Sequence, residues 1–236
     1  EPGDRRLHRS QEPGEEFLAA RQRCEIADLL RAHQQVGGDY YDVFQISSSE
    51  WVFCLGDVSG KGMPAAFLMS NFQAYVRNAF EEKRPDLVNL ANKLNKRVWD
   101  AAQGEKFITF FLGVYNANDQ SLEYVNCGHN APVFKSASEF RHFGATSIGL
   151  GMLPELPKVS QVNVEVKSGD ILLGYTDGLV EVNNAEGDYF EMEGIEKSLI
   201  GNHAKDVCLS VETAANDFRG ECKFNDDVAI LAICWK

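Results

Sequence analysis

The sequence predicts an α+β fold in which helices pack on two stacked, mostly antiparallel β-sheets. Short apolar runs rich in aromatic and β-branched residues recur between glycine-containing turns, which is typical of buried strands. Three longer segments instead repeat apolar residues at helical spacing. The order is strands, two helices, more strands, a third helix and a last strand. Layers of helices on two sheets bury the apolar side of every such element.

The expected elements follow this order along the chain. Strands are expected at 24–32, 40–46, 51–58, 107–115, 121–126, 131–135, 159–166, 171–175 and 228–235. The apolar faces of the helices are Leu68, Phe72, Tyr75, Val76 and Ala79; Leu87, Leu90, Ala91, Leu94, Val98 and Ala101; and Val207, Val211, Ala214, Ala215 and Phe218. Pro64 lies near the start of the first helix, where its missing N–H costs little. Pro85 and Asp86 mark the start of the second helix.

Length and composition limit the function classes. The 236 residues suffice for one domain with a real core, and 44% hydrophobic and 25% charged residues are ordinary values. The net charge of −12 disfavours a nucleic-acid partner, because an acidic surface repels a phosphate backbone. We find no apolar run long enough to span a bilayer and no signal-peptide pattern. We therefore expect a cytoplasmic location, with the cytosolic domain of a membrane-attached sensor as an alternative.

The start of the chain differs from the rest. Residues 1–16 are polar and contain Pro2, Gly3, Pro13 and Gly14, and we expect 1–21 to be a linker or N-terminal extension from an upstream regulatory region. A short helical piece is expected at 17–22, and the folded domain is expected to occupy 22–236.

The cysteines form no recognisable site. The six are Cys24, Cys54, Cys127, Cys208, Cys222 and Cys234. No pair has C-x-x-C spacing and most lie in apolar runs, so reduced core thiols are expected rather than disulfides or a zinc site.

Two glycine-containing motifs carry the first candidate acids. Gly37 and Gly38 precede Asp39, where the backbone turns sharply before a strand; alone, this is an ordinary turn. Asp57 ends a strongly apolar strand, where a carboxylate is costly unless a positive partner offsets it. The loop after Asp57 resembles a phosphate-binding P-loop at Gly60-Lys61, but its spacing differs and a glycine replaces the required Ser or Thr. A metal held by Asp57 is the better interpretation.

Two further motifs repeat this pattern. The strand at 171–175 leads to Asp177 and Gly178, and Asp226 and Asp227 stand directly before the last strand. Adjacent acids at the mouth of a core strand repel each other unless a cation offsets them. Acids at four strand ends, from distant parts of the chain, are what a hard divalent cation requires.

Nucleophilic alternatives find little support in the sequence. The histidines are His8, His33, His129, His142 and His203, without ligand spacing, and no G-x-S-x-G occurs. His129, within 126–130, is interpreted as part of a polar turn between strands.

Five motifs together resemble the SpoIIE/RsbU-type bacterial serine phosphatases of the PPM superfamily of metal-dependent Ser/Thr phosphatases. They are V-G-G-D-Y-Y-D (36–42), G-D-V-S-G-K-G (56–62), N-C-G-H-N-A-P (126–132), G-D-I-L-L-G-Y-T-D-G (169–178) and D-D-V-A-I-L (226–231). The resemblance covers about residues 22 to 236. It implies a four-layer α/β-β/α sandwich with metals in a cleft at one end of the two sheets.

The resemblance also implies roles for individual residues. Asp57 would bridge two Mn²⁺ or Mg²⁺ ions, and the backbone carbonyl of Val58 would bind one of them. Asp177 and Asp226 would bind the other, Asp39 would contribute directly or through water, and Asp227 would be a supporting ligand; a third ion is an option. The implied reaction is hydrolysis of phosphoserine or phosphothreonine by a metal-bridging hydroxide. The implied partners are a phosphorylated STAS-type anti-sigma-factor antagonist in a bacterial signalling pathway, an upstream sensor domain and a second copy in a homodimer.

The sequence departs from better-known relatives in two ways. Animal and plant members have a histidine just after the metal-binding Asp-Gly, where this chain has 59–61, Ser-Gly-Lys. They also have an arginine just before the first acid, where this chain has Gln34 and Gln35, with Arg31 further off. The resemblance therefore leaves open which residue binds the substrate phosphate. SpoIIE-like members commonly lack both features.

Two rival functions remain from the sequence. One is a catalytically silent scaffold, which the complete set of acids disfavours, and the other is a hydrolase of small phosphorylated metabolites or nucleotides. Because 60–80 links the loop after Asp57 to a helix, we expect an upstream domain or dimer contact to regulate metal affinity through that helix.

Overall fold

The computed structural model describes residues 24–31, 38–137 and 139–236. The predicted linker at 1–21 and the predicted short helix at 17–22 lie outside these residues. Within the described ranges the chain forms two five-stranded sheets and five helices. Every pair of neighbouring strands is antiparallel, which confirms the predicted sheets.

The first sheet has the strand order β1-β10-β9-β6-β7. Its strands are β1 (Cys24–Arg31), β10 (Val228–Trp235), β9 (Ile171–Tyr175), β6 (Val133–Ser136) and β7 (Glu139–His142). All eight residues of β10 are buried, as the continuous apolar run before the C-terminus predicts.

The second sheet has the order β2-β3-β4-β5-β8. Its strands are β2 (Tyr40–Gln45), β3 (Glu50–Val58), β4 (Ile108–Asn116), β5 (Ser121–Cys127) and β8 (Val162–Glu165). Strand β8 is shorter than the predicted run at 159–166. The pairing of β2 with β3 sets Tyr40 opposite Gly56, so the start of one strand lies beside the end of the other.

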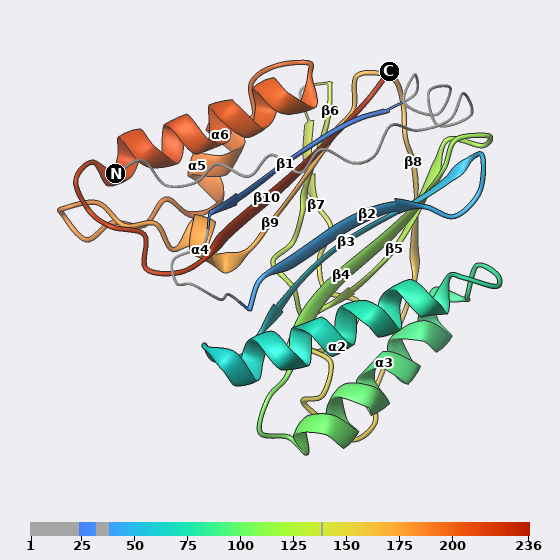
Figure 1. The fold of residues 1–236 in the computed structure, drawn as a ribbon. Coiled ribbons are helices and arrows are strands. Elements are labelled where there is room, and N and C mark those ends of the chain that lie inside the picture. The colour runs from blue at the N-terminus through green and yellow to red at the C-terminus, as the bar shows by residue number, and fades with distance from the viewer. Residues whose placement is uncertain (1–23, 32–37, 138) are drawn as a thin grey trace.

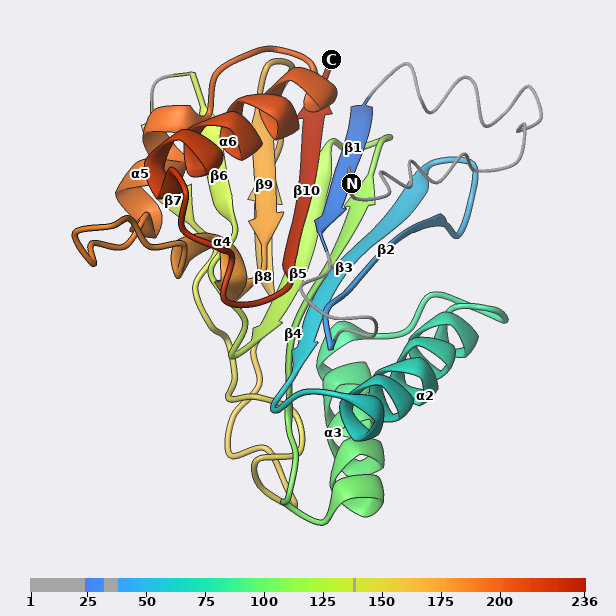
Figure 2. The same cartoon turned by 60° about the vertical axis from the view of Figure 1, so that its left-hand side comes forward.

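Helices cover the outer face of each sheet, and the two sheets stack between them (Figures 1 and 2). Helices α2 (Met63–Ala79) and α3 (Leu87–Ala102) lie on the second sheet; α4 (Asp177–Val180), α5 (Glu191–Ser198) and α6 (Ala204–Arg219) lie on the first. The four layers are those of the predicted α/β-β/α sandwich. Asp86 caps α3 by accepting a hydrogen bond from the Asn89 N–H at 2.8 Å, as the sequence suggested for this helix start.

Strand β3 illustrates how the core is built. Its alternate residues Phe53 and Leu55 pack between the two sheets, whereas Val52 and Cys54 pack against the helices α2 and α3. A third apolar cluster lies between the first sheet and α4 to α6. A strand buried on both faces explains why 51–58 is nearly continuously apolar.

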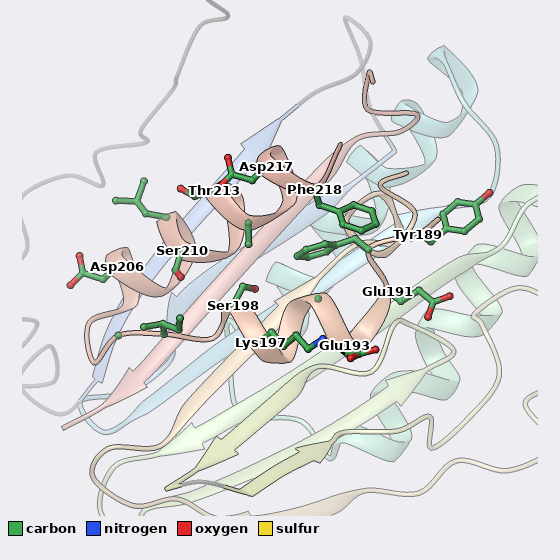
Figure 3. A pocket seen from close by; sticks show the side chains of 16 residues that line it. Tyr189, Glu191, Glu193, Lys197, Ser198, Asp206, Ser210, Thr213, Asp217 and Phe218 are labelled. Atoms are coloured by element: carbon green, nitrogen blue, oxygen red, sulfur yellow. Dashed lines mark hydrogen bonds and ion pairs between the residues drawn. The ribbon is translucent and has the colours of Figure 1, made fainter. Parts of the chain in front are cut away.

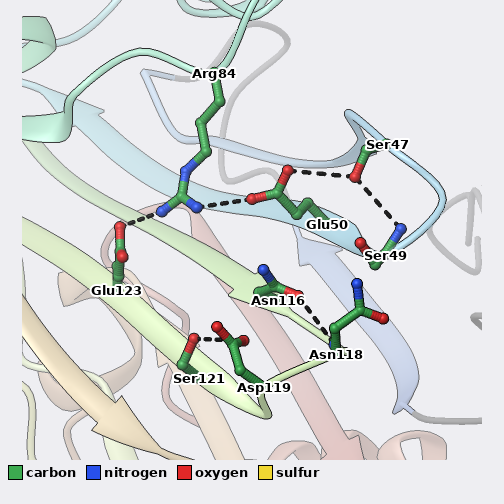
Figure 4. A network of polar contacts seen from close by, with 9 residues as sticks. All are labelled: Ser47, Ser49, Glu50, Arg84, Asn116, Asn118, Asp119, Ser121 and Glu123. Atoms are coloured by element: carbon green, nitrogen blue, oxygen red, sulfur yellow. Dashed lines mark hydrogen bonds and ion pairs between the residues drawn. The ribbon is translucent and has the colours of Figure 1, made fainter.

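A polar network joins the segment between α2 and α3 to the second sheet (Figure 4). The Arg84 guanidinium donates to Glu50 Oε1 of β3 at 2.7 Å and forms a second ion pair with Glu123 of β5. Ser47 donates to the other Glu50 oxygen at 3.3 Å. Arg84 thereby fixes the helical layer to two strands that are not neighbours.

All six cysteines are free, as predicted. Five of them are buried in the core, and Cys222 is half-buried. Burial raises the pKa of the Cys24, Cys127 and Cys208 thiols to about 12, so these groups stay protonated and unreactive at neutral pH. Across the described ranges, no helix is both long enough and apolar enough to cross a bilayer.

Candidate metal centre

A cavity of about 340 Å³ opens where the end of β3, the starts of β2 and α4, and the loop before β10 meet. Its lining consists of Gly38, Asp39, Asp57, Val58, Ser59, Gly60, Lys61, Gly62, Phe107, Thr109, Asp177, Asp226 and Asp227. All six predicted site residues are in this set. The structure therefore brings together five chain segments that are up to 189 positions apart, between 38 and 227.

Glycine makes the approach of the first two segments possible. A Cβ atom on Gly38 would lie 3.2 Å from Asp57 Oδ1 and 3.3 Å from the carbonyl oxygen of Val58. Such contacts are tight, so a side chain at this position would push the Asp39 segment away from β3. Asp39 consequently stands directly beside Asp57, one residue before β2 begins.

A contact between the two sheets also depends on a glycine. A Cβ on Gly174 of β9 would lie 2.5 Å from Leu55 Cδ1 of β3. Leu55 occupies the space that this glycine leaves, which holds the two strands close near their ends. Asp57 lies two residues beyond Leu55, and Asp177 lies three residues beyond Gly174, so this contact sets the two acids on either side of the cavity.

A third glycine fits the last segment against α4. A Cβ on Gly178 would lie 1.9 Å from the backbone oxygen of Asp227. Asp177 is the first residue of α4, where the prediction had placed it at a strand end. Thr176 Oγ1 accepts a hydrogen bond from the Ala229 N–H at 2.8 Å and ties β9 to β10 just behind the acids.

Burial and mutual repulsion raise the pKa values of Asp39, Asp57 and Asp177. Burial raises the pKa of Asp39 to about 8, a hydrogen bond from Thr176 opposes this, and the negative charges of Asp57 and other acids add to it. Burial also raises the pKa of Asp57 to about 7, with Asp177 and Asp226 adding to the shift. Burial, followed by repulsion from Asp226, raises the pKa of Asp177. The raised pKa values show that nearby positive charges do not offset the negative charge of these three carboxylates.

The donor set fits hard divalent cations. The oxygen Oδ2 of Asp39 is buried and has no hydrogen-bond partner, and five carboxylates and a backbone carbonyl line one cavity. Oxygen-only donors are the set that Mg²⁺ and Mn²⁺ prefer. Within the described ranges, no three Asp, Glu, His or Cys side chains are already grouped around one cation position. Carboxylates repel one another, so without a cation between them we expect them to stand apart around the cavity.

Among the residues that line this cavity, Lys61 is the one with a positively charged side chain, and the sequence did not single it out as a site residue. Lys61 Nζ lies 2.6 Å from Asp226 Oδ2 and donates to the backbone oxygen of Asn225 at 3.3 Å. The available signal is a lysine between two glycines, four positions after Asp57, which we interpret from the sequence only as a P-loop resemblance and as part of the departure at 59–61 from better-known relatives. Arg31, the nearest arginine considered from the sequence, instead pairs with Glu212 at 2.6 Å and does not line the cavity.

His129 is buried and contacts Thr109, a residue that lines the cavity. Its Nδ1 is 2.9 Å from Thr109 Oγ1, which faces the cavity, and its backbone N–H donates to Asn126 Oδ1 at 2.8 Å. Burial lowers the pKa of His129 to about 4, which keeps the ring neutral. The interpretation of His129 as part of a turn between strands is confirmed, and the ring also supports a cavity residue.

A second hollow of about 850 Å³ lies between α5 and α6 (Figure 3). Its lining includes the apolar side chains of Phe190, Leu209 and Phe218 and shares no residue with the aspartate cavity. The one lysine in it, Lys197, pairs with Glu193 at 2.5 Å. Of these two hollows, only the smaller one is lined by the predicted site residues.

Comparison with known proteins agrees with this architecture. A family model described as Stage II sporulation protein E (SpoIIE) matches residues 47–236. The chain is 27% identical over 181 residues to Phosphoserine phosphatase RsbU of Bacillus subtilis, covering 76% of this chain and 52% of RsbU. It is 25% identical over 243 residues to Protein IcfG of Synechocystis sp., covering 90% of this chain and 38% of IcfG. The chain thus spans about half or less of these curated relatives.

Among solved structures, the chain resembles the PP2C phosphatase domain with a fragment of the regulatory domain of SpoIIE from Bacillus subtilis. The TM-score is 0.78 at 17% sequence identity, covering 90% of this chain and 63% of that one. This likeness concerns the fold, which is that of PP2C-type phosphatases. Together with the family match over most of its length, it shows that the chain belongs to the SpoIIE family.

Proposed function

We propose that the chain is a metal-dependent protein serine/threonine phosphatase. The observation that carries this proposal is the ring of five aspartates around one cavity, with a buried Asp39 oxygen that has no hydrogen-bond partner. Membership of the SpoIIE family and the likeness to Phosphoserine phosphatase RsbU support the same activity.

The cavity residues would hold two, or with a further site three, Mn²⁺ or Mg²⁺ ions. Asp57, the Val58 carbonyl, Asp177 and Asp226 would supply the main ligands. Asp39 would contribute directly or through water, and Asp227 would be a supporting ligand. When bound, such ions supply a water that is deprotonated near neutral pH and neutralise charge on the phosphoryl group. The chain's own task is to hold the carboxylates in position by the close glycine contacts described above.

The substrate is phosphoserine or phosphothreonine on a small STAS-type antagonist of an anti-sigma factor, within a bacterial signalling pathway. This assignment is supported by the family and by the names of the relatives, RsbU and Stage II sporulation protein E. A direct screen would present phosphorylated STAS proteins and unrelated phosphoproteins to the chain and compare their rates of dephosphorylation.

Hydrolysis of p-nitrophenyl phosphate and of a phosphoserine peptide, with and without Mn²⁺, tests the activity. We expect Mn²⁺-dependent turnover that Asp57→Ala abolishes while its circular dichroism spectrum stays unchanged. Asp100→Ala is the matched control, because Asp100 pairs with Lys96 on the exposed side of α3. Full activity of Asp57→Ala in Mn²⁺ would contradict the proposal, and no turnover by the wild-type chain would favour a silent scaffold.

Regulation acts through helix α2 in this proposal. The helix begins at Met63, directly after Gly62 of the cavity lining, so a partner that shifts α2 also shifts the loop after Asp57. An upstream sensor domain or a second copy is the expected partner. Identical Mn²⁺ dependence of this chain and of a longer protein that includes the upstream domain, with and without its signal, would argue against such control.

A further inference from the structure

The cavity lining contains a positively charged side chain that metal binding by the aspartates does not explain. Its lining, as described above, contains five aspartates and one lysine. We propose that Lys61 binds the phosphate group of the substrate and competes with the metal ions for Asp226. This inference rests on the proposed phosphatase function and assigns the phosphate-binding group that the sequence left open.

The position of Lys61 suits contact with an incoming phosphate. Its Nζ is held at 2.6 Å from Asp226 Oδ2, yet 51% of the side chain is exposed. The ammonium group is therefore fixed at the cavity and still reachable from solvent. A lysine carries a compact point charge on a flexible stem and is a common phosphate-binding residue. A small rotation of that stem moves the charge from the carboxylate to a phosphate oxygen.

The loop around Lys61 allows this movement without disturbing Asp57. Gly60 and Gly62 on either side have φ angles of +86° and +82°, a conformation that favours glycine. The base of the loop is fixed, because the Ser59 N–H donates to the Phe107 carbonyl at 2.9 Å and the Phe107 N–H donates to Ser59 Oγ at 2.9 Å. Only the tip that carries Lys61 is left open to solvent.

Other nearby cations are engaged elsewhere. Lys106 donates to the backbone oxygen of Ser59 at 3.1 Å, beneath the loop, and does not line the cavity. Arg31 pairs with Glu212, and Arg77 pairs with Asp42. Among the described residues, Lys61 is thus the cation best placed to meet a phosphate ester at this cavity.

The ion pair between Lys61 and Asp226 predicts opposite effects of a Lys61 substitution on metal binding and on phosphate binding. While Lys61 pairs with Asp226, it neutralises a carboxylate that the metal ions require. Removing the lysine charge should therefore tighten metal binding and weaken phosphate binding. A lysine that only stabilised the loop would weaken both, and a lysine without a role would change neither.

Lys61→Met and Lys61→Arg, compared with wild type, test these opposite effects, with Lys96→Met on α3 as the matched control. Mn²⁺ affinity is measured by calorimetry, inorganic phosphate affinity by calorimetry on the Mn²⁺-saturated protein, and KM and kcat with a phosphoserine peptide. For Lys61→Met we expect a several-fold tighter Mn²⁺ Kd, together with KM and phosphate Kd values raised about tenfold, as for the loss of one charge-assisted hydrogen bond. Lys61→Arg should keep the KM close to wild type, since it retains the charge.

Unchanged phosphate affinity and KM in Lys61→Met would overturn the inference, and so would weaker Mn²⁺ binding. The outcome is separable from the proposed function. A wild-type chain that binds Mn²⁺ and phosphate without turnover contradicts the phosphatase proposal, while the two affinities still decide the role of Lys61. A wild-type chain that binds no Mn²⁺ overturns both.

Discussion

Arg77 of α2 and Asp42 of β2 form a two-point ion pair, with Nε 2.6 Å from Oδ2 and Nη2 2.5 Å from Oδ1. Asp42 is only 8% exposed, and the Tyr40 hydroxyl donates to it at 3.1 Å. The guanidinium also lies 4.4 Å from the centre of the Phe44 ring. The ion pair thereby anchors the C-terminal half of α2 to β2, and the neighbouring strand β3 carries Asp57.

Arg77→Ala should lower the free energy of unfolding by about 2 kcal/mol. The substitution leaves a buried carboxylate without its charged partner, a loss that is moderated because the Arg77 side chain is 47% exposed. Urea unfolding at pH 7.5 measures the effect. Adding Asp42→Asn to Arg77→Ala should restore part of the loss, because the uncompensated charge is then removed. Equal stability of the single and double variants would mean that the ion pair is not the cause.

Gly178→Ala should displace Asp226 and Asp227, two of the aspartates that line the cavity. A methyl group there meets the Asp227 carbonyl at 1.9 Å, so the segment of Asp226 and Asp227 must shift. Overpacking of this kind costs about 1–3 kcal/mol, and we also expect at least several-fold weaker Mn²⁺ binding by calorimetry. Gly144→Ala is the matched control, since no atom lies within 4 Å of its added methyl group. Wild-type Mn²⁺ affinity in Gly178→Ala would show that the close contact does not position the acids.

The neutral state of His129 should make its contribution to stability depend on pH. Its folded pKa of about 4 lies below the ordinary value of 6.5, so the native state disfavours protonation. The contribution is fully present above pH 6.5 and is lost as the pH falls towards 4. The total change is about 3 kcal/mol for a shift of this size.

The measurement compares wild type and His129→Gln by urea unfolding between pH 4 and 8. The raised pKa values of Asp39 and Asp57 act in the opposite direction, since their contributions are present at low pH and lost as the pH rises towards 7 to 8. They are common to both proteins and cancel in the difference. The stability advantage of wild type should therefore shrink as the pH falls, and a constant difference would contradict a neutral buried ring.

Metal removal should destabilise the folded chain if the aspartates bind cations. Binding to the native state alone raises the free energy of unfolding by about 2.7 kcal/mol at a metal concentration 100 times the Kd. We expect Mn²⁺ to raise the melting temperature of wild type, EDTA to reverse this, and Asp57→Asn to abolish it. A melting temperature of Asp57→Asn that rises with Mn²⁺ as much as wild type would place the ion elsewhere.

Local sequence features were sufficient to predict most elements and to single out the five aspartates that line the cavity, whereas the Val58 carbonyl was implied only by the family resemblance. An acid next to an apolar run, with a glycine close by in three of the four cases, is a pattern within one segment and can be seen without the fold. The elements missed have weak local patterns. All four residues of β7 are exposed, so it has no buried face, and α4 has only four residues. Helix α5 has no side-chain cap at its start, and Glu191 there has a φ of +52°.

The sequence by itself determined most of the strands and helices and which acids stand at strand ends, because periodicity and turn residues act over a few positions. Only the tertiary structure decided which ends share one cavity. Leu55 against Gly174 and Gly178 against Asp227 are contacts between sequence-distant segments, and they set the distances on which repulsion and metal binding depend. The pairing of Lys61 with Asp226 is of the same kind. Coulomb energy depends on separation in space, and no local pattern contains that separation.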